Sequence, residues 1–277
     1  MGIDRDESAA LLWRELPQVR RARDFHLYDF RGRRYLDMYL AAGRALMGHR
    51  PDRLLLTTKN LISKGLLADF PSNQERRLLR ALTTLLPNHS EVRIYANMER
   101  LATALSSLSP RLAAGQQLPD PALEQVDGQR VALWRPFLPE IPEGEPDVLI
   151  PVLPFPASFA PVVACFRPGS AGAAASSDTV SPALLGALCA SIFSLARFAE
   201  RYDESVWRQM DSDLWERRGP YLRARCKKAE YPALFRRLME SGVVICPDYP
   251  GPSIVPASFT EGEIKPIARV AADSRSE

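Results

Sequence analysis

The side chains that could do covalent chemistry in this chain are few, and primary amines are the scarcest of them. Of the 36 basic residues only five are lysines, namely Lys59, Lys64, Lys227, Lys228 and Lys265. A lysine amine can form an imine with a carbonyl compound, whereas the guanidinium of arginine stays protonated and cannot. No lysine lies between Lys64 and Lys227. The middle of the chain therefore offers no amine for imine chemistry, and we expect Lys59, Lys64, Lys227 and Lys228 to be solvated.

The histidines and cysteines form no recognisable site. The three histidines are His26, His49 and His89, and no spacing of Asp or Glu around them indicates a metal cage. We expect His49, which follows Gly48, to be structural. The four cysteines are far apart and include no Cys-x-x-Cys pair, so neither a zinc site nor a disulfide framework is indicated. They fit reduced thiols in a cytoplasmic protein.

Other common catalytic motifs do not occur either. No Gly-x-Ser-x-Gly sequence or glycine-rich phosphate loop is found. Arginines cluster near the N-terminus, at Arg14, Arg20, Arg21, Arg23, Arg31, Arg33 and Arg34. Such a cluster could bind nucleic acid, but Glu15, Asp24 and Asp29 interleave with it and the net charge is only +3. We favour a solvated face and keep nucleic-acid binding as an alternative.

No segment indicates insertion into a membrane or secretion. The longest apolar run, residues 183–196, is shorter than the roughly 18 residues that a membrane span needs, so we expect a buried helix. The N-terminus carries acidic residues where a signal peptide needs a basic head and an apolar core.

Local patterns predict the elements of the first hundred residues. Residues 26–30 and 33–38 are strand-like and flank Gly32, which predicts a hairpin. A helix is expected from Pro51 to about Gly65. Ser72 and Glu75 form a capping box before a helix that ends at Pro87. Residues 92–96 then look like a strand that leads into a helix at 99–108.

The middle of the chain, residues 110–179, holds many of the 24 prolines. Proline interrupts both helices and ladders, so we expect extended segments and loops, with residues 147–153 as the best buried strand. The Gly/Ala/Ser-rich end of this region, up to residue 179, is expected to be mobile.

The last hundred residues alternate helices and short strands. Ser181 and Pro182 start a long apolar helix. We expect residues 203–218 to continue helical, with Trp207, Met210 and Leu214 on the inner face. A helix over residues 231–241 ends at Gly242, strands at 243–246 and 253–255 form a small sheet, and Thr260 caps a final helix.

A family resemblance rests on several of these segments. Its clearest motif is Asp29-x-x-Gly32-x-x-Tyr35-Leu36-Asp37 followed by Gly48-His49. The motif resembles the N-terminal signature of the class III pyridoxal-phosphate aminotransferases, the group of the ornithine, acetylornithine and glutamate-1-semialdehyde enzymes. The likeness continues through Lys64-Gly65 and Pro71 to VRIYANMERLATAL, residues 92–105, and returns weakly at residues 242–264. About half of the chain is covered.

The resemblance implies an α/β fold: a reduced fold-type-I PLP-transferase-like architecture with a truncated large-domain sheet and an α+β small domain. We divide the chain into an N-terminal hairpin segment at residues 1–50 that packs with the small domain, a reduced large domain at 51–179, and the small domain at 180–277. The middle segment is too short for the several βα units of a complete doubly wound sheet.

Pyridoxal chemistry needs a lysine, an acid for the ring nitrogen and donors for the phosphate. The family's phosphate turn reads Ser-Gly-Thr-Glu-Ala, and the matching positions here are Ala96, Asn97, Met98 and Glu99, followed by Arg100, without the glycine or the hydroxyls. The expected acid follows a buried strand in the family, but Asp147 precedes the strand here. The family's lysine position falls in the region that has none. We therefore predict no bound pyridoxal phosphate, no catalytic residue and no metal.

These gaps predict an aminotransferase-like protein without pyridoxal chemistry that acts as a binding, regulatory or structural partner. Because family members form dimers, a homodimer or a pair with a full-length relative is expected. The alternative is an enzyme or small-molecule binder, aminotransferase or aminomutase related, that uses the remnant pocket for amino or keto acids. In that case Arg93, Arg100 and Arg135 could hold carboxylates.

Overall fold

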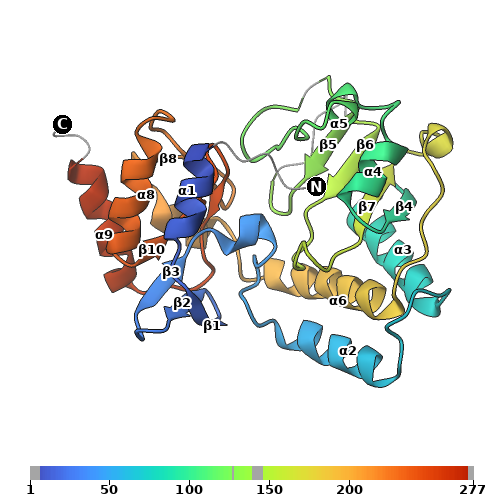
Figure 1. The fold of residues 1–277 in the computed structure, drawn as a ribbon, viewed down its shortest axis with the longest axis horizontal. Helices are drawn as coiled ribbons and strands as arrows, with labels where there is room; N and C mark the ends of the chain where they lie inside the picture. Colours follow the sequence, from blue (N-terminus) through green and yellow to red (C-terminus); the bar gives the residue numbers. More distant parts are fainter. Residues whose placement is uncertain (1–6, 127, 139–145, 274–277) are drawn as a thin grey trace. The chain divides into compact units, whose positions relative to one another are not determined.

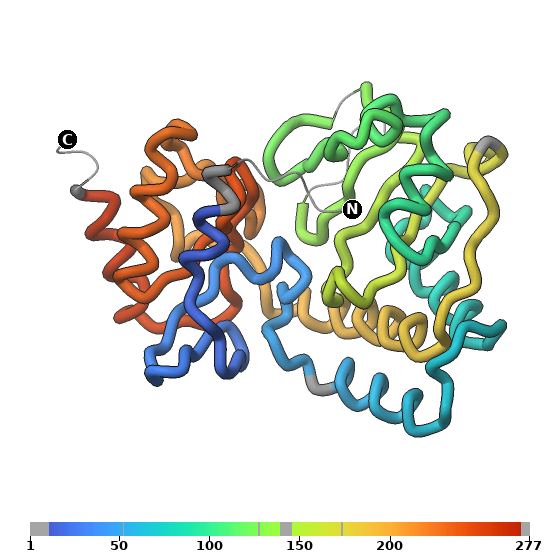
Figure 2. The backbone as a smooth tube through the Cα atoms, in the orientation of Figure 1, coloured from blue at the N-terminus to red at the C-terminus, as the bar shows by residue number. Residues whose placement is uncertain are grey.

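The chain forms two compact units (Figures 1 and 2), in a computed structural model that describes residues 7–126, 128–138 and 146–273. One unit comprises residues 52–197, and the other joins residues 2–51 to residues 198–277. The N-terminal segment thus groups with the C-terminal residues. The long helix at 182–199, which the sequence assigned to the C-terminal domain, falls mostly in the unit of residues 52–197.

The first unit is built on a four-stranded sheet in the order β4-β7-β6-β5. Its strands are β4 (Glu91–Tyr95), β5 (Val131–Trp134), β6 (Val148–Pro151) and β7 (Val162–Phe166). Only β5 and β6 are parallel, and β7 runs antiparallel to both β6 and β4. The expected strand at 147–153 is confirmed as β6. The proline-rich middle also supplies β5 and β7, where the sequence predicts extended segments and loops without a specific strand. Residues 139–145 of that region lie outside the described residues.

Helices cover both faces of this sheet (Figure 1). They are α2 (Asp52–Ser63), α3 (Asn73–Leu85), α4 (Met98–Ala104), α5 (Pro110–Ala113) and α6 (Pro182–Ala199). Alternate side chains of β6 separate the two cores: Leu149 joins the cluster that includes residues of α3 and α6, while Val148 and Ile150 join the cluster of α4 and α5. The middle strands are therefore buried on both faces, which the three-layer architecture requires.

Local signals fix the ends of several of these helices. Ser72 accepts a hydrogen bond from the amide of Gln74 and caps α3, as the capping box predicts. Among the described residues, α6 is the one helix long and apolar enough to cross a membrane, by length and composition only. Because 61% of it is buried and Leu185, Leu188 and Ile192 pack in the core, α6 is a core helix.

The second unit contains two small sheets. One has the order β1-β2-β3-β10, with β1 (Val19–Arg23), β2 (His26–Asp29), β3 (Arg34–Asp37) and β10 (Val243–Val244). The other has the order β11-β9-β8, with β8 (Trp215–Arg218), β9 (Tyr221–Ala224) and β11 (Ser253–Ile254). The predicted hairpin is confirmed as β2–β3. The two C-terminal strands exist, but they belong to different sheets.

Helices α1 (Glu7–Glu15), α8 (Tyr231–Glu240) and α9 (Glu261–Asp273) complete this unit, together with the short α7 (Glu204–Trp207). Residues of both sheets and of the three longer helices share one apolar core. Gly242 follows α8 at φ +88°, a conformation that favours glycine, and lets the chain turn directly into β10. Glu263 accepts from the amide and hydroxyl of Thr260, which confirms the predicted cap of α9.

The helix predicted for residues 203–218 is wrong over its second half. After α7 and a 3₁₀ turn at Arg208–Met210, the chain forms strand β8, which pairs with β9 through the turn at Gly219 and Pro220. Trp215 and Leu222 of this hairpin are buried in the core of the unit. The periodicity of the apolar residues fits a helix equally well, and the long-range packing of the hairpin decides the outcome.

Candidate functional site

The turn that resembles a phosphate site lies between β4 and α4. Asn97 is the N-cap of α4, and its side-chain oxygen accepts a hydrogen bond from the amide of Arg100 at 2.9 Å. Ala96, Asn97, Met98 and Glu99 are all exposed. The structure therefore places these four residues at a strand-to-helix turn, as the sequence predicts. The side chain of Asn97, the polar residue among the first three, caps the helix.

An internal carboxylate lies at this turn, where an anion would be expected. The amide of Ala96 donates to Oδ2 of Asp178 at 3.0 Å. Arg100 donates to both oxygens of the same carboxylate, from Nη2 at 2.8 Å and from Nε at 3.3 Å. These hydrogen bonds, first from Arg100 and then from Ala96, hold the pKa of Asp178 below its usual value. Asp178 thus makes the kind of contacts that an anionic group receives at the start of a helix.

The segment that carries Asp178 is hydrogen-bonded along the edge strand β4. Tyr95 donates its hydroxyl to the carbonyl of Ala175, the amide of Ile94 donates to the hydroxyl of Ser177, and the amide of Asp178 donates to the carbonyl of Ile94. We expected this small-residue stretch to be mobile. Its last residues are instead attached to the strand, because their backbone and hydroxyl groups satisfy polar groups at the edge of the sheet.

The five lysines are all exposed. Lys59 lies on α2 and Lys64 in the turn after it, Lys227 and Lys228 lie between β9 and α8, and Lys265 lies on α9. A lysine that forms an imine is activated by desolvation or by a neighbouring cation. The exposure of Lys59, Lys64, Lys227 and Lys228 fits the solvated role that the sequence predicts for them.

The buried strand β6 ends without an acid. Asp147 precedes it and accepts a hydrogen bond from Nε of Arg130 at 2.8 Å, on a partly exposed surface. Val152 and Leu153, which follow β6, are buried and apolar. In the described part of the chain, the turn between β4 and α4 thus holds an internal carboxylate, apolar residues follow β6 directly, and the five lysines are exposed.

Two of the three candidate arginines for carboxylates are already committed within the protein. Arg100 binds Asp178. Arg135, only 4% exposed, forms a two-pronged ion pair with Asp120, with both distances at 2.6 Å. Arg93 is half-buried and donates to the carbonyl of Val92. The forks of Arg100 and Arg135 therefore serve the fold.

A second polar cluster holds the N-terminal motif together. One oxygen of the buried Asp37 accepts the amides of Tyr39 and Leu40, and the other contacts Nε2 of His49 at 2.7 Å. The turn that follows holds Leu40, Ala41 and Ala42 at positive φ, between 44° and 55°. Asp37 thus stabilises a strained turn. The contact of His49 with the same carboxylate supports the structural role expected for this histidine.

The remaining candidate chemistry adds no site. No group of three or more His, Cys, Asp and Glu residues that could hold a metal occurs in the described part of the chain. All four cysteines are free thiols, and burial raises the pKa of Cys165 to about 12. No local pattern indicated the Asp178 contact, because its partners Ala96 and Arg100 lie 82 and 78 residues away in the chain.

No protein-family model matches the chain. An uncharacterized protein of Treponema pallidum is 27% identical over 292 residues, which cover 88% of this chain and 90% of that protein. A glutamate-1-semialdehyde 2,1-aminomutase of Clostridium acetobutylicum is 27% identical over only 78 residues, 28% of this chain and 18% of that enzyme. The similarity to the Treponema pallidum protein extends over most of both chains, but the name of that protein gives no function.

Solved structures establish the fold. The ornithine δ-aminotransferase of Plasmodium falciparum superposes with a TM-score of 0.66 at 12% identity, covering 92% of each chain. An acetylornithine aminotransferase of Elizabethkingia anophelis gives a TM-score of 0.64 at 12% identity, covering 92% of this chain and 93% of that one. The fold implied by the sequence motifs, that of the class III aminotransferases, is confirmed.

Proposed function

We propose that this chain is an aminotransferase-like protein that has lost pyridoxal chemistry and acts as a non-catalytic binding, regulatory or structural partner in the cytoplasm. The observation that carries the proposal is the contact of Asp178 with Ala96 and Arg100. A carboxylate at this turn repels a phosphate group and competes with it for the same donors. The exposure of the five lysines and the apolar end of β6 support the same conclusion.

Incubation with pyridoxal phosphate followed by borohydride reduction tests this proposal. Exposed lysines react weakly and without selectivity, so we expect less than one adduct per chain, spread over several lysines in the peptide map. A stoichiometric adduct at a single lysine, with a visible imine band before reduction, would overturn the proposal.

A matched pair of variants tests the role of the carboxylate. Asp178→Ala frees the amide of Ala96 and the guanidinium of Arg100, and inorganic phosphate should then bind more tightly than to the unmodified protein. Asp147→Ala, which removes a carboxylate from another surface ion pair, should leave phosphate binding unchanged. Equal phosphate binding by all three proteins would show that Asp178 does not block an anion.

We infer further that the protein forms a homodimer, or pairs with a full-length relative, through an apolar surface on the first unit. This α2 surface comprises exposed side chains of α2, of the segment after it and of α6: Leu55, Leu56, Ile62, Leu67, Phe70 and Phe193. Helices α2 and α6 lie side by side in Figures 1 and 2, and a Cβ at Gly186 of α6 would meet Leu61 of α2. Exposed apolar side chains gathered on neighbouring elements are typical of protein interfaces.

Light scattering after size-exclusion chromatography tests the dimer. Leu56→Glu should convert a dimer into a monomer, because it places a charge in the α2 surface. Phe159→Glu changes an equally exposed aromatic side chain outside that surface and should leave the dimer intact. A dimer that resists Leu56→Glu would refute this interface, and a wild-type monomer would leave only the pairing with a relative.

The alternative function is an enzyme or binder that uses the remnant pocket for amino or keto acids. The aminotransferase fold favours it, whereas the commitment of Arg100 and Arg135 to internal carboxylates opposes it. A thermal-shift screen with amino acids and keto acids tests it, since a bound ligand raises the melting temperature. A rise that Arg93→Gln abolishes would support the alternative.

A further inference from the structure

The second unit contains a cavity of about 700 Å³ that no part of the proposed function uses. It lies between the segment that leads into β8, the strand itself and the last turns of α9. Its lining combines two aspartates and two arginines with Ser212, Trp215 and three alanines of α9; the charged residues are Asp211, Asp213, Arg217 and Arg225. A volume in this range is typical of small-molecule pockets.

The sequence of α9 creates the space. Ala268, Ala271 and Ala272 are spaced three and four residues apart and therefore share one face of the helix. Ile267 and Val270 lie on the core side and are buried. A face of methyl groups leaves room beside the helix and gives the cavity an apolar wall.

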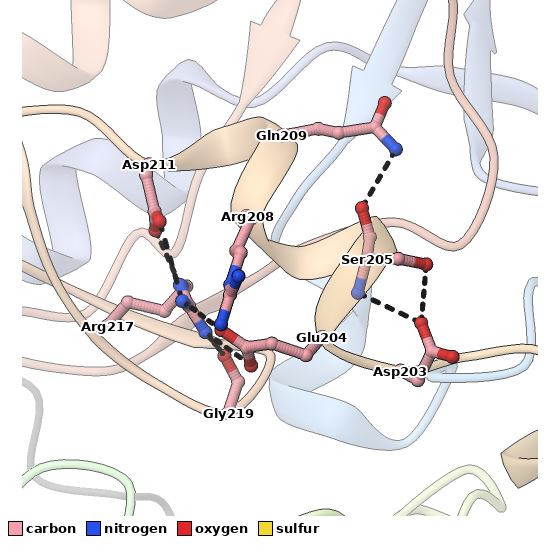
Figure 3. A network of polar contacts seen from close by, with 8 residues as sticks. All are labelled: Asp203, Glu204, Ser205, Arg208, Gln209, Asp211, Arg217 and Gly219. Atoms are coloured by element: carbon pink, nitrogen blue, oxygen red, sulfur yellow. Dashed lines mark hydrogen bonds and ion pairs between the residues drawn. The ribbon is translucent and has the colours of Figure 1, made fainter.

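Arg217, which lines the cavity, is held by the network of polar contacts drawn in Figure 3. Its guanidinium contacts the carboxylates of Glu204 and Asp211 and donates to the carbonyl of Gly219. These ion pairs raise the pKa of Arg217 above its usual value. They also offset the negative charge of Asp211, which precedes β8 in the chain. Because its donors are engaged by this network, Arg217 positions the wall and is not the group that a ligand would meet.

Arg225 is the available cation of the cavity. Its Nε donates to the carbonyl of Trp215 at 2.8 Å, which fixes the plane of the guanidinium. Neither of its terminal nitrogens has a hydrogen-bond or ion-pair partner among the described residues, and the side chain is exposed. A guanidinium held by one nitrogen with its terminal donors free matches the geometry of a carboxylate.

Trp215 lies beside the cavity and can report on a ligand there. It lines the cavity and is only 3% exposed, and its indole nitrogen is buried with almost no accessible surface. A ligand in the cavity therefore does not reach the indole N–H, but binding next to this residue should change its fluorescence.

We propose that this cavity binds a small aliphatic carboxylate, with its anionic end on Arg225 and its carbon chain along the alanines of α9. The site lies wholly within the second unit, and it does not depend on the loss of pyridoxal chemistry. It would give the protein a ligand-dependent state that is separate from the remnant phosphate turn.

Titration with succinate, followed by tryptophan fluorescence and by the melting temperature, tests this site. We expect a saturable change in fluorescence and a higher melting temperature in the intact protein. Arg225→Gln should weaken binding about tenfold or more by removing the guanidinium. Ala268→Leu, at an exposed helix position, should also weaken it by filling the cavity.

Arg223→Gln is the matched control, because Arg223 lies in β9, two residues before Arg225, and does not line the cavity. This variant should bind succinate normally. A weak specific site has a dissociation constant of roughly 1 mM or below. Binding that does not saturate at about 10 mM succinate would therefore overturn the proposal. So would unchanged binding in Arg225→Gln. An equal response to inorganic phosphate would overturn the assignment of the ligand as a carboxylate.

Discussion

Replacement of Asp120 by alanine should destabilise the first unit strongly, because it breaks a buried ion pair. Arg135 is 4% exposed and donates from Nε and Nη2 to the two oxygens of Asp120, both at 2.6 Å. Asp120 also accepts from the amide of Ala122 and so orders the turn before β5. Asp120→Ala removes the carboxylate that pairs with this nearly buried guanidinium and both hydrogen bonds between them. Breaking a buried ion pair from one side costs about 3–5 kcal/mol.

The expected change in melting temperature follows from the size of the unit. An unfolding entropy of about 2.1 cal/mol/K per residue over residues 52–197 gives about 0.3 kcal/mol/K. A loss of about 3–5 kcal/mol then lowers the melting temperature by roughly 10–16 °C. Calorimetry measures this shift directly, and urea denaturation gives the corresponding free energy.

Two controls separate burial of the ion pair from a general effect of removing an aspartate. Asp147→Ala breaks the exposed pair with Arg130 and should cost less than about 1 kcal/mol. The double variant Asp120→Ala/Arg135→Met also removes the charge of Arg135 and should recover part of the lost free energy of unfolding. If Asp120→Ala melts within a few degrees of Asp147→Ala, Arg135 is not committed to the fold and becomes available to a ligand.

Three further predictions address other parts of the chain. Gly48 has φ +88°, and a Cβ there would lie 2.9 Å from the carbonyl oxygen of Asp24, whereas Gly32 has φ +82° with open space around it. In chemical denaturation, Gly32→Ala should lower the free energy of unfolding by about 1–2 kcal/mol because of the positive φ. Gly48→Ala should lower it further because of the close approach. Equal losses would exclude the close approach. Folding lowers the pKa of Asp178. The stability that this carboxylate contributes is therefore complete above about 3.9, the pKa of an aspartate in the unfolded chain, and is lost as the pH falls through the folded pKa. Between about pH 5 and pH 2, the melting temperature of the Asp178→Asn variant should decline less steeply than that of the wild type. A parallel decline in both proteins would contradict this contribution. Burial raises the pKa of Cys165 to about 12, so an aromatic disulfide reagent at pH 8 should leave Cys165 unmodified until the protein unfolds, while the half-buried Cys226 reacts first. Rapid labelling of Cys165 in the native protein would refute its burial.

The elements that sequence reasoning located correctly carry their signals within a few residues. Ser72 and Thr260 cap helices through groups two or three positions away, and the hairpin of β2 and β3 turns at Gly32. The prediction failed for residues 211–218, where the same apolar spacing fits a helix or a strand. Pairing of β8 with β9 resolved it, and that pairing depends on the core of the whole unit.

The candidate site was predictable in what it lacks and not in what it contains. The types of residues at 96–99 excluded a glycine-rich phosphate turn, and the distribution of the lysines excluded an amine in the middle of the chain. The carboxylate of Asp178, the partner of Arg135 and the cavity beside Trp215 had no local signal. Each joins residues from separate elements, so their positions follow only when the elements have packed.

By itself, the sequence determined the inventory of reactive groups and the ends of the helices with local caps, because hydrogen bonds between near neighbours depend on residue type alone. The tertiary structure decided which distant groups meet: Asp178 at the start of α4, β10 beside β3, and Arg225 with the alanines of α9 in the lining of one cavity. These contacts arise because apolar faces must be buried together, and the polar groups that those faces carry are brought into contact as a consequence.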